Sequence, residues 1–149
     1  MSKIHTMKKS AGFTLLELIA VILIVSILSV TAISRFANQS DYSLRTEQEL
    51  VIAALFQAQQ LAMSGRPTQF AILSDNTFTV RDATNAANHY DVAGITYPQE
   101  LRGGVTFNSS SLVLTYNGLG ATAPSVIGLE VGGDSAQIAV SGAGYARAQ

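Results

Sequence analysis

The chain of 149 residues contains no cysteine, no tryptophan and only two histidines. Without cysteine it has no disulfide, no thiolate nucleophile and no metal site built on thiolates. His5 lies in the basic N-terminal stretch, and His89 lies in a polar segment without a spaced acid or a second ligand. The sequence also lacks a glycine-rich phosphate loop and the nucleophile elbow of serine hydrolases. These absences argue against an enzyme and against a bound metal or cofactor.

Charge is also scarce, because only 13% of the residues are charged whereas 48% are hydrophobic. The apolar excess is concentrated in one run from Phe13 to about Ser34, in which Glu17 is the only charged residue. About 20 apolar residues form a helix long enough to cross the roughly 30 Å hydrocarbon core of a bilayer. Basic residues precede the run, so the positive-inside rule places the N-terminus in the cytoplasm. We therefore expect a transmembrane helix over residues 13–35.

Glu17 is unusual in such a segment. A carboxylate inside a spanning helix costs a few kcal/mol even on lenient insertion scales, so it requires a partner or a function. A cut after Gly12 would free the α-amine of Phe13, and that amine on a neighbouring copy would be a natural counter-charge. The window combines a short basic leader ending in Gly12, Phe13 after the cut and Glu17 as the fifth residue from it. It resembles the N-terminal signature of the type IV pilin family.

This resemblance implies that a prepilin peptidase cuts between Gly12 and Phe13, removes leader residues 1–12 and N-methylates Phe13. Glu17 is then expected to act in assembly. The implied partners are other pilin or pseudopilin subunits, the peptidase, an inner-membrane assembly platform and inner-membrane lipid. The C-terminal domain is expected in the periplasm and later in a pilus or pseudopilus. Met1 and Met7 both remain open as the start of the chain.

An ordinary secretory signal peptide is the main alternative for the N-terminal run. Ala32-Ile33-Ser34 has the small residues of such a cleavage site. The apolar core is too long for a signal peptide, however, and it carries a glutamate. An uncut signal anchor would leave the glycine before the run and the glutamate within it without a role. Both alternatives are therefore disfavoured.

Residues 36–65 are expected to continue the helix in amphipathic form. Apolar residues recur there with a 3.6-residue period, the pattern of a helix packed on a core. The residues on this face are Leu44, Leu50, Val51, Ala54, Leu55, Ala58, Leu61 and Ala62. Gly65, with Pro67 beyond it, is expected to end the helix.

The opposite face of this segment mixes polar and apolar side chains. Its polar residues are Gln48, Glu49, Gln59 and Gln60, and its apolar residues are Ile52, Phe56 and Met63. Two interpretations remain open for the apolar residues. Either a broad sheet wraps around the helix and buries them, or they form a contact stripe for neighbouring subunits.

Beyond Pro67 the period changes to two, which is typical of strands, and residues 66–149 are expected to form an antiparallel β ectodomain. The expected strands cover residues 70–72, 78–80, 95–97, 105–107, 112–116, 126–131, 136–141 and 144–147. Ser74-Asp75-Asn76 and Gly132-Gly133-Asp134-Ser135 are expected hairpin connections. The polar segment from Asp82 to Gly94 is expected to be a surface loop, with His89 as a lone surface residue.

A helix followed only by antiparallel strands is an α+β domain in which the sheet packs on the helix, and it matches the pilin fold. The helix end Ala58 to Pro67, the following hairpin and the C-terminal Gly144-Tyr145-Ala146-Arg147 resemble the H-type minor pseudopilin of type II secretion. Ile33-Ser34-Arg35-Phe36, together with residues 58–62, is similar to a minor pilin of mannose-sensitive haemagglutinin pili. These resemblances imply a minor structural subunit that acts in filament assembly or initiation.

A DNA-binding minor pilin for DNA uptake is the alternative function. Loss of the leader leaves six arginines against ten acidic side chains, a formal net charge of −4. Only Arg147 lies in the C-terminal tail, with Arg102 the nearest earlier cation, and phosphate affinity grows with the number of cations engaged. Binding of nucleic acid is therefore disfavoured. A calcium site built from Asp75, Asn76 and Asp134 is also disfavoured, because such residues favour turn geometry by themselves.

The leader generates a direct test. In cells that contain the peptidase, Gly12→Phe should leave a full-length precursor held in the membrane, because a bulky side chain replaces the glycine before the cut. Immunoblotting and N-terminal sequencing measure the outcome, with Ser2→Phe as the control. A mature form of Gly12→Phe that begins at Phe13 would contradict the assignment of the cleavage site.

Overall fold

The computed structural model describes residues 14–92 and 94–149, and it describes their side chains except for residues 30–39. The described residues form one helix and eight strands. These are α1 (Leu15–Met63), β1 (Thr68–Ser74), β2 (Thr77–Asp82), β3 (Gln99–Glu100), β4 (Thr106–Phe107), β5 (Leu112–Tyr116), β6 (Ser125–Val131), β7 (Asp134–Val140) and β8 (Ala146–Ala148). The chain divides into two compact units, one that ends at Ala37 and one from Asn38 to Gln149.

Helix α1 ends where the sequence predicts. Gly65 has a φ of 87°, which favours glycine because other residues rarely adopt it. The N–H of Arg66 donates to the carbonyl of Leu61 at 3.1 Å, and the N–H of Gly65 donates to the carbonyl of Ala62 at 3.0 Å. This pair of hydrogen bonds is a Schellman motif, which satisfies carbonyls at the end of the helix.

No helix within the described residues is both long enough and apolar enough to qualify as a membrane span. The transmembrane helix expected over residues 13–35 therefore stays a prediction.

The strands form two antiparallel sheets rather than the single sheet that the sequence suggested. One described sheet has the order β3-β2-β1-β5, and the other has the order β4-β6-β7-β8. β1 lies between β2 and β5, with Phe70 opposite Val80 on one side and Leu114 on the other. Alternation along a strand indicates which side chains share a face, but it does not indicate which strands pair. The alternation in the sequence therefore did not indicate that the strands divide into two sheets.

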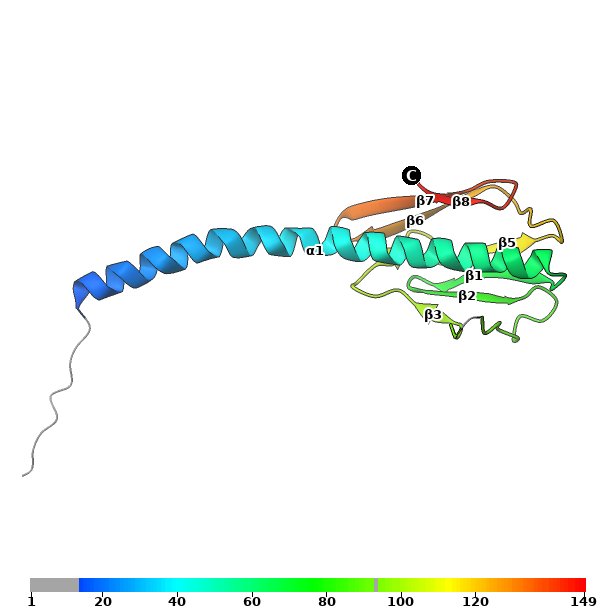
Figure 1. The fold of residues 1–149 in the computed structure, drawn as a ribbon, viewed down its shortest axis with the longest axis horizontal. Helices are drawn as coiled ribbons and strands as arrows, with labels where there is room; N and C mark the ends of the chain where they lie inside the picture. The colour runs from blue at the N-terminus through cyan, green and yellow to red at the C-terminus, as the bar shows by residue number, and fades with distance from the viewer. Residues whose placement is uncertain (1–13, 93) are drawn as a thin grey trace, which may run out of the picture. The chain divides into compact units, whose positions relative to one another are not determined.

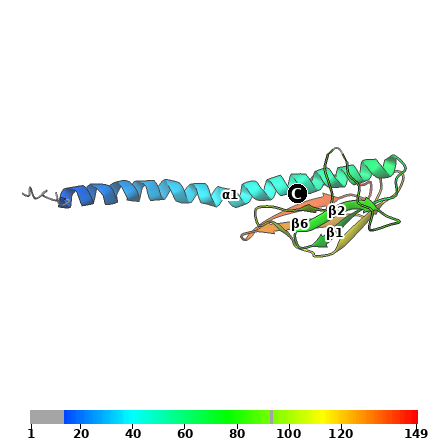
Figure 2. The same cartoon turned by 90° about the horizontal axis from the view of Figure 1, so that it is seen from below.

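The second half of α1 packs on both sheets. In the view of Figure 1, β6, β7 and β8 lie along one flank of this half and β1, β2 and β3 along the other; Figure 2 shows the same helix above the strands. The core contains side chains from the helix and from both sheets. Its fully enclosed members include Val51, Leu55, Ala58, Phe70, Phe78, Val80, Leu129 and Ile138, each with 0% exposure. Burial of each large side chain contributes about 1.5–3 kcal/mol, so this face anchors the domain.

The predicted core face of the helix is confirmed. Six of its eight residues are buried, and Leu50 and Leu61 are half-buried and packed against the core. Phe70 stacks on Phe78 with ring centroids 5.6 Å apart, and Phe107 meets Phe78 edge-on at 6.1 Å. These aromatic contacts join the two sheets beneath the helix, because Phe107 belongs to β4 and Phe78 to β2.

Two predictions about the polar face are wrong. Gln48 and Gln59 were expected on the face opposite the core, but each is less than 9% exposed. The Gln48 amide donates to the carbonyl of Gln137 at 2.8 Å. The Gln59 amide donates to the carbonyls of Gly120 and Ala143 at 3.1 and 2.9 Å. The buried arc of the helix is wider than expected because the second sheet and its loops accept these amides.

The β6–β7 connection is tighter than expected. Val131 pairs with Asp134, so the turn consists of Gly132 and Gly133 alone, and Asp134 and Ser135 already belong to β7. Both glycines have positive φ, at 57° and 95°, as a type I′ hairpin turn requires. The predicted strand over residues 95–97 is wrong, because the described chain has only an isolated bridge there, between Val92 and Ile95.

Two buried tyrosines differ in hydrogen bonding and provide a test of the core. The hydroxyl of Tyr97 donates to Oε1 of Gln57 at 2.6 Å, whereas the buried hydroxyl of Tyr116 has no partner among the described residues. Burial raises the pKa of each tyrosine to about 12. Tyr116→Phe should raise the free energy of unfolding by about 1 kcal/mol, and Tyr97→Phe should lower it by about 1 kcal/mol.

The measurement is urea unfolding of a fragment covering residues 38–149, followed by circular dichroism at pH 7. Both variants remove one hydroxyl and keep the ring, so each serves as the control for the other. Equal destabilisation by the two variants would contradict the assigned difference between the hydroxyl groups.

Candidate functional site

Helix α1 begins with a side-chain cap. Oγ1 of Thr14 accepts a hydrogen bond from the backbone N–H of Glu17 at 3.3 Å, and the carbonyl of Thr14 accepts from the N–H groups of Glu17 and Leu18 at 3.1 and 3.2 Å. Threonine followed three residues later by glutamate is the capping-box pattern. A carboxylate in the first turn is also favoured by the helix dipole. The prediction for Glu17 did not take this local role into account, although Thr14-Leu15-Leu16-Glu17 is visible in the sequence.

The described first turns of α1 present apolar side chains all around the helix. Leu15 and Leu16 are 79% and 80% exposed, and the large apolar residues from Leu18 to Leu28 are all exposed. The hydroxyls of Ser26 and Ser29 donate to the carbonyls four residues earlier, at 2.6 and 2.7 Å. The polar groups of these serines are thus satisfied within the helix, which suits apolar surroundings. Gly12 and Phe13 lie outside the described residues, so the cleavage site stays a prediction.

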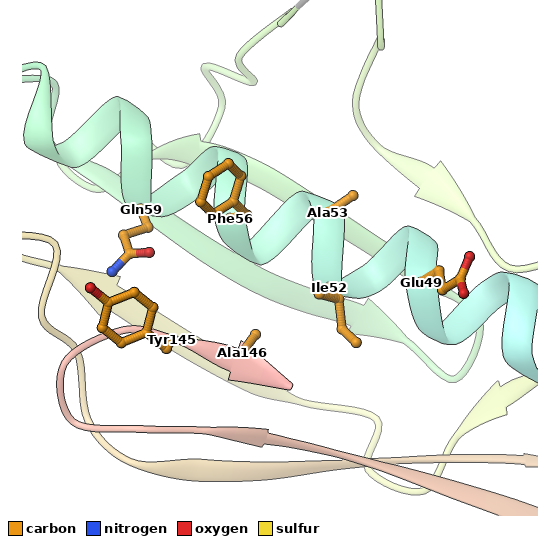
Figure 3. A pocket seen from close by; sticks show the side chains of 7 residues that line it. All are labelled: Glu49, Ile52, Ala53, Phe56, Gln59, Tyr145 and Ala146. Atoms are coloured by element: carbon orange, nitrogen blue, oxygen red, sulfur yellow. The ribbon is translucent and has the colours of Figure 1, made fainter. Parts of the chain in front are cut away.

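The second unit has a groove beside the outer face of α1. The groove has a volume of about 300 Å³ and is lined by Glu49, Ile52, Ala53, Phe56, Gln59, Tyr145 and Ala146. Figure 3 shows Tyr145 and Ala146 facing the helix residues across this groove. Phe56 and Tyr145 are 53% and 69% exposed, although both are large and aromatic. Exposed apolar side chains grouped in a groove are typical of an interaction surface.

The three predicted contact residues have different positions. Ile52 is half-buried against the core and lines the groove, and Phe56 lines the groove with its ring exposed. Met63 is 60% exposed at the end of α1, outside the residues that line the groove. The interpretation in which the sheet buries all three is therefore wrong for Phe56 and Met63. The sequence analysis did not identify Tyr145 as a residue that lines the same groove, because its placement depends on the C-terminal turn.

Two glycines hold this turn close to the helix. A Cβ on Gly144, where φ is 85°, would lie 1.9 Å from the carbonyl oxygen of Gly120 and 2.6 Å from Nε2 of Gln59. A Cβ on Gly120 would lie 2.9 Å from the side chain of Gln59 and 2.9 Å from the sulfur of Met63. The position of Tyr145 thus depends on a close approach that only glycine permits.

The segment after Asp82 folds back on the sheet. Hydrogen bonds from the hydroxyl and the N–H of Thr84 hold the pKa of Asp82 below its usual value. His89 is half-buried, and its Nδ1 lies 2.7 Å from Oγ1 of the fully buried Thr79. The prediction of a lone surface histidine is therefore wrong. His89 covers β2 and has a structural partner.

Two of the three residues considered for calcium accept hydrogen bonds from separate serines. Oδ1 of Asn76 accepts a hydrogen bond from Ser74 at 3.1 Å, and Oδ2 of Asp134 accepts one from Ser40 at 2.9 Å. Within the described residues, no group of three or more His, Cys, Asp or Glu side chains is arranged to hold a metal ion. Arg102 and Arg147 are both exposed, but they line different hollows of the surface.

The Gly144 contact generates a stability prediction. In the fragment covering residues 38–149, Gly144→Ala should lower the free energy of unfolding by about 3 kcal/mol, because a strained φ combines with a steric clash. Gly133→Ala is the matched control, since Gly133 has a φ of 95° but open space around its Cβ position. The control should lose only about 1 kcal/mol. If urea unfolding shows the same loss of unfolding free energy in both variants, the result would argue against close packing at Gly144.

Three comparisons place this geometry among known proteins. Residues 7–33 match the family model described as the prokaryotic N-terminal methylation motif. Comparison with curated protein sequences finds no matching relative. The fold is similar to the minor pseudopilin EpsH of the type 2 secretion system of Vibrio cholerae, with a TM-score of 0.56 and 15% identity over 72% of this chain and 96% of that chain.

The fold is also similar to the type IV minor pilin FimU of Pseudomonas aeruginosa. One crystal form gives a TM-score of 0.53 and 16% identity, over 73% of this chain and 90% of that chain. A second crystal form gives a TM-score of 0.53 and 15% identity, over 71% of this chain and 92% of that chain. The predicted α+β pilin fold and the H-type resemblance are thus confirmed at the level of fold. The chain carries the N-terminal methylation motif of prokaryotic type IV pilins, and its described residues share the fold of a minor pilin and a minor pseudopilin.

Proposed function

We propose that this chain is a minor structural subunit of a type IV pilus or of a related type II secretion pseudopilus, and that it acts in filament assembly or initiation. The observation that carries this proposal is the methylation motif at residues 7–33 joined to a pilin fold. The motif alone covers a short segment, and the fold alone supports many functions. Their combination in one chain favours a filament subunit.

The proposal includes processing at the membrane. A prepilin peptidase cuts between Gly12 and Phe13 and methylates the new amine, and the inner-membrane assembly platform then receives the subunit. Before assembly, residues 13–35 anchor the chain in inner-membrane lipid with the second unit in the periplasm. The exposed apolar side chains of the first turns and the satisfied serine hydroxyls support this placement. Glu17 is the only charged residue between Phe13 and Ser34.

Glu17 has two roles in this proposal. Its backbone N–H takes part in the cap formed by Thr14, so it helps to start the helix. Its carboxylate, placed in apolar surroundings, is disfavoured by several kcal/mol unless a cation meets it. The amine of Phe13 on an adjacent subunit offsets this cost only when the two helices have the correct axial offset. The contact therefore favours assembly in register more than it favours anchoring.

The outer face of α1 in the second unit supplies the other subunit contacts. Ile52 and Phe56 line the groove, and Met63 is exposed at the end of the helix. Burial of exposed apolar surface drives association, and each large side chain that is covered contributes about 1.5–3 kcal/mol. A neighbouring subunit that covers the groove gains this free energy. The chain itself carries out no reaction in this proposal, and no feature of the described residues favours binding of nucleic acid.

Substitutions at Glu17 separate its two roles. Glu17→Ala removes the charge and the acidic side chain that the capping-box pattern places three residues after Thr14, whereas Glu17→Gln removes the charge but keeps a residue that capping boxes accept. Both variants should insert and be cut at least as well as the parent, because each makes the helix less charged. Both should enter filaments poorly. The measurement is the ratio of subunit in sheared filaments to subunit in the inner membrane, by immunoblot.

Thr14→Ala is the matched control, because it removes the cap and leaves the carboxylate. We expect it to enter filaments nearly as well as the wild type. A defect in Glu17→Ala and Thr14→Ala with normal assembly of Glu17→Gln would show that assembly needs the capping-box residues at the start of the helix and does not need the charge. Unchanged ratios in both Glu17 variants would remove this residue from the mechanism.

A further inference from the structure

A second hollow lies on the other side of the outer face of α1. It has a volume of about 470 Å³ and is formed by one stretch of the helix and by β3 with the loop that follows it. Its lining residues are Thr46, Glu47, Glu49, Leu50, Gln99, Glu100 and Arg102. Three of these residues carry carboxylates and one carries a cation, so the hollow has an excess of negative charge. The name acidic pocket is used for this set of residues below.

Glu47 is the unusual member of the acidic pocket. Its side chain is only 6% exposed, and its Oε2 is buried without a hydrogen-bond partner in the described part of the chain. Buried carboxylates are normally paired or fully hydrogen-bonded, because removing a charge from water is costly. Because Glu47 also lines the hollow, a cation that enters the hollow can supply the missing donor once the carboxylate turns toward it.

The other residues of the pocket do not supply that partner. Arg102 lines the same hollow, but no ion pair joins it to Glu47 among the described residues, and its side chain is exposed. The three carboxylates do not converge as a metal site does, since no described group of acidic side chains is arranged to hold a metal ion. Carboxylates spread around a large hollow suit a long cation with several donors instead.

We propose that the acidic pocket receives an arginine side chain from a neighbouring filament subunit. A guanidinium has five N–H donors in a fixed plane and pairs with carboxylates through two hydrogen bonds at once. The half-buried Leu50 offers apolar surface to the aliphatic part of such a side chain. The inference rests on the proposed function, because it needs a neighbouring subunit, but it concerns the periplasmic domain and is separate from the contact at Glu17.

The arrangement gives the single chain a stability cost that the assembled filament removes. In the isolated subunit, Glu47 is buried without full compensation. In the filament, the incoming guanidinium supplies the missing donors and selects the neighbour, because a partner without the cation leaves the carboxylate unpaired. Removal of this charge should therefore have opposite effects on the two states.

The first measurement uses the full chain in detergent micelles. Glu47→Gln should raise the melting temperature by about 3 °C, because an amide is less costly to bury than an unpaired carboxylate. Glu130→Gln is the matched control, since it makes the same charge change at an exposed site on β6, and it should leave the melting temperature unchanged. A fall in the melting temperature of Glu47→Gln overturns the proposal, because the carboxylate would then have a stabilising partner inside the chain.

The second measurement identifies the occupant in cells. A photo-reactive phenylalanine analogue at Gln99, on the wall of the pocket, should cross-link to another filament subunit beside one of its arginines. Glu47→Gln should lower the yield of this product about tenfold, as expected when one member of a buried charge pair is lost, and Glu130→Gln should not. Replacing the identified arginine by glutamine should have the same effect, and the double variant should be no worse than either single one.

The outcomes separate this inference from the proposed function. A wild-type chain that enters filaments but cross-links at Gln99 to lipid, to no protein, or to a site without an arginine overturns the inference and leaves the proposed function intact. If Glu47→Gln does not change the yield of the cross-linked product, the inference is likewise overturned and the proposed function stays intact. A wild-type chain that is absent from sheared filaments and from pseudopili overturns the proposed function itself.

Discussion

The structure of the second unit depends on the burial of one wide face of α1 against two sheets at once. Val51, Leu55 and Ala58 have no exposed surface, so this face is part of a core that contains side chains from both sheets. The buried arc extends to Gln48 and Gln59, whose amides donate to backbone carbonyls of β7 and of the loops at Gly120 and Ala143. These bonds fix the rotation of the helix about its axis, because a turned helix would bury the amides without acceptors.

This fixed rotation decides which residues remain available for contacts. Phe56 and Met63 are exposed to solvent, and the C-terminal turn adds Tyr145 to the lining of the groove, beside Gln59 (Figure 3). On the other side of the same face, the largely buried Glu47 lines the acidic pocket. The groove offers apolar area and the pocket offers charge, so the two surfaces suit different parts of a neighbouring subunit. Apolar area supplies association free energy, whereas a buried charge mainly selects the partner.

Local patterns predicted most of the secondary structure. The 3.6-residue period gave the buried face of α1, Gly65 gave its end, and Gly132-Gly133 gave the β6–β7 turn, because each depends on nearby residues. The predictions failed where contacts between residues far apart in the chain decide the structure. The second sheet, the hydrogen bond between His89 and Thr79 and the buried amides of the helix all depend on pairing between segments far apart in the chain.

The sequence by itself determined the apolar run with Glu17, the basic stretch before it and the α+β class, since these are contiguous patterns of charge, hydrophobicity and turn residues. Only the tertiary structure decided that Phe56 and Tyr145 line one groove and that Glu47 is buried without a full set of partners. The physical reason is that exposure and hydrogen bonding are properties of the packed chain. A side chain on the border between the buried and the exposed face of a helix has the same local sequence in either state, and the neighbouring sheet decides between them.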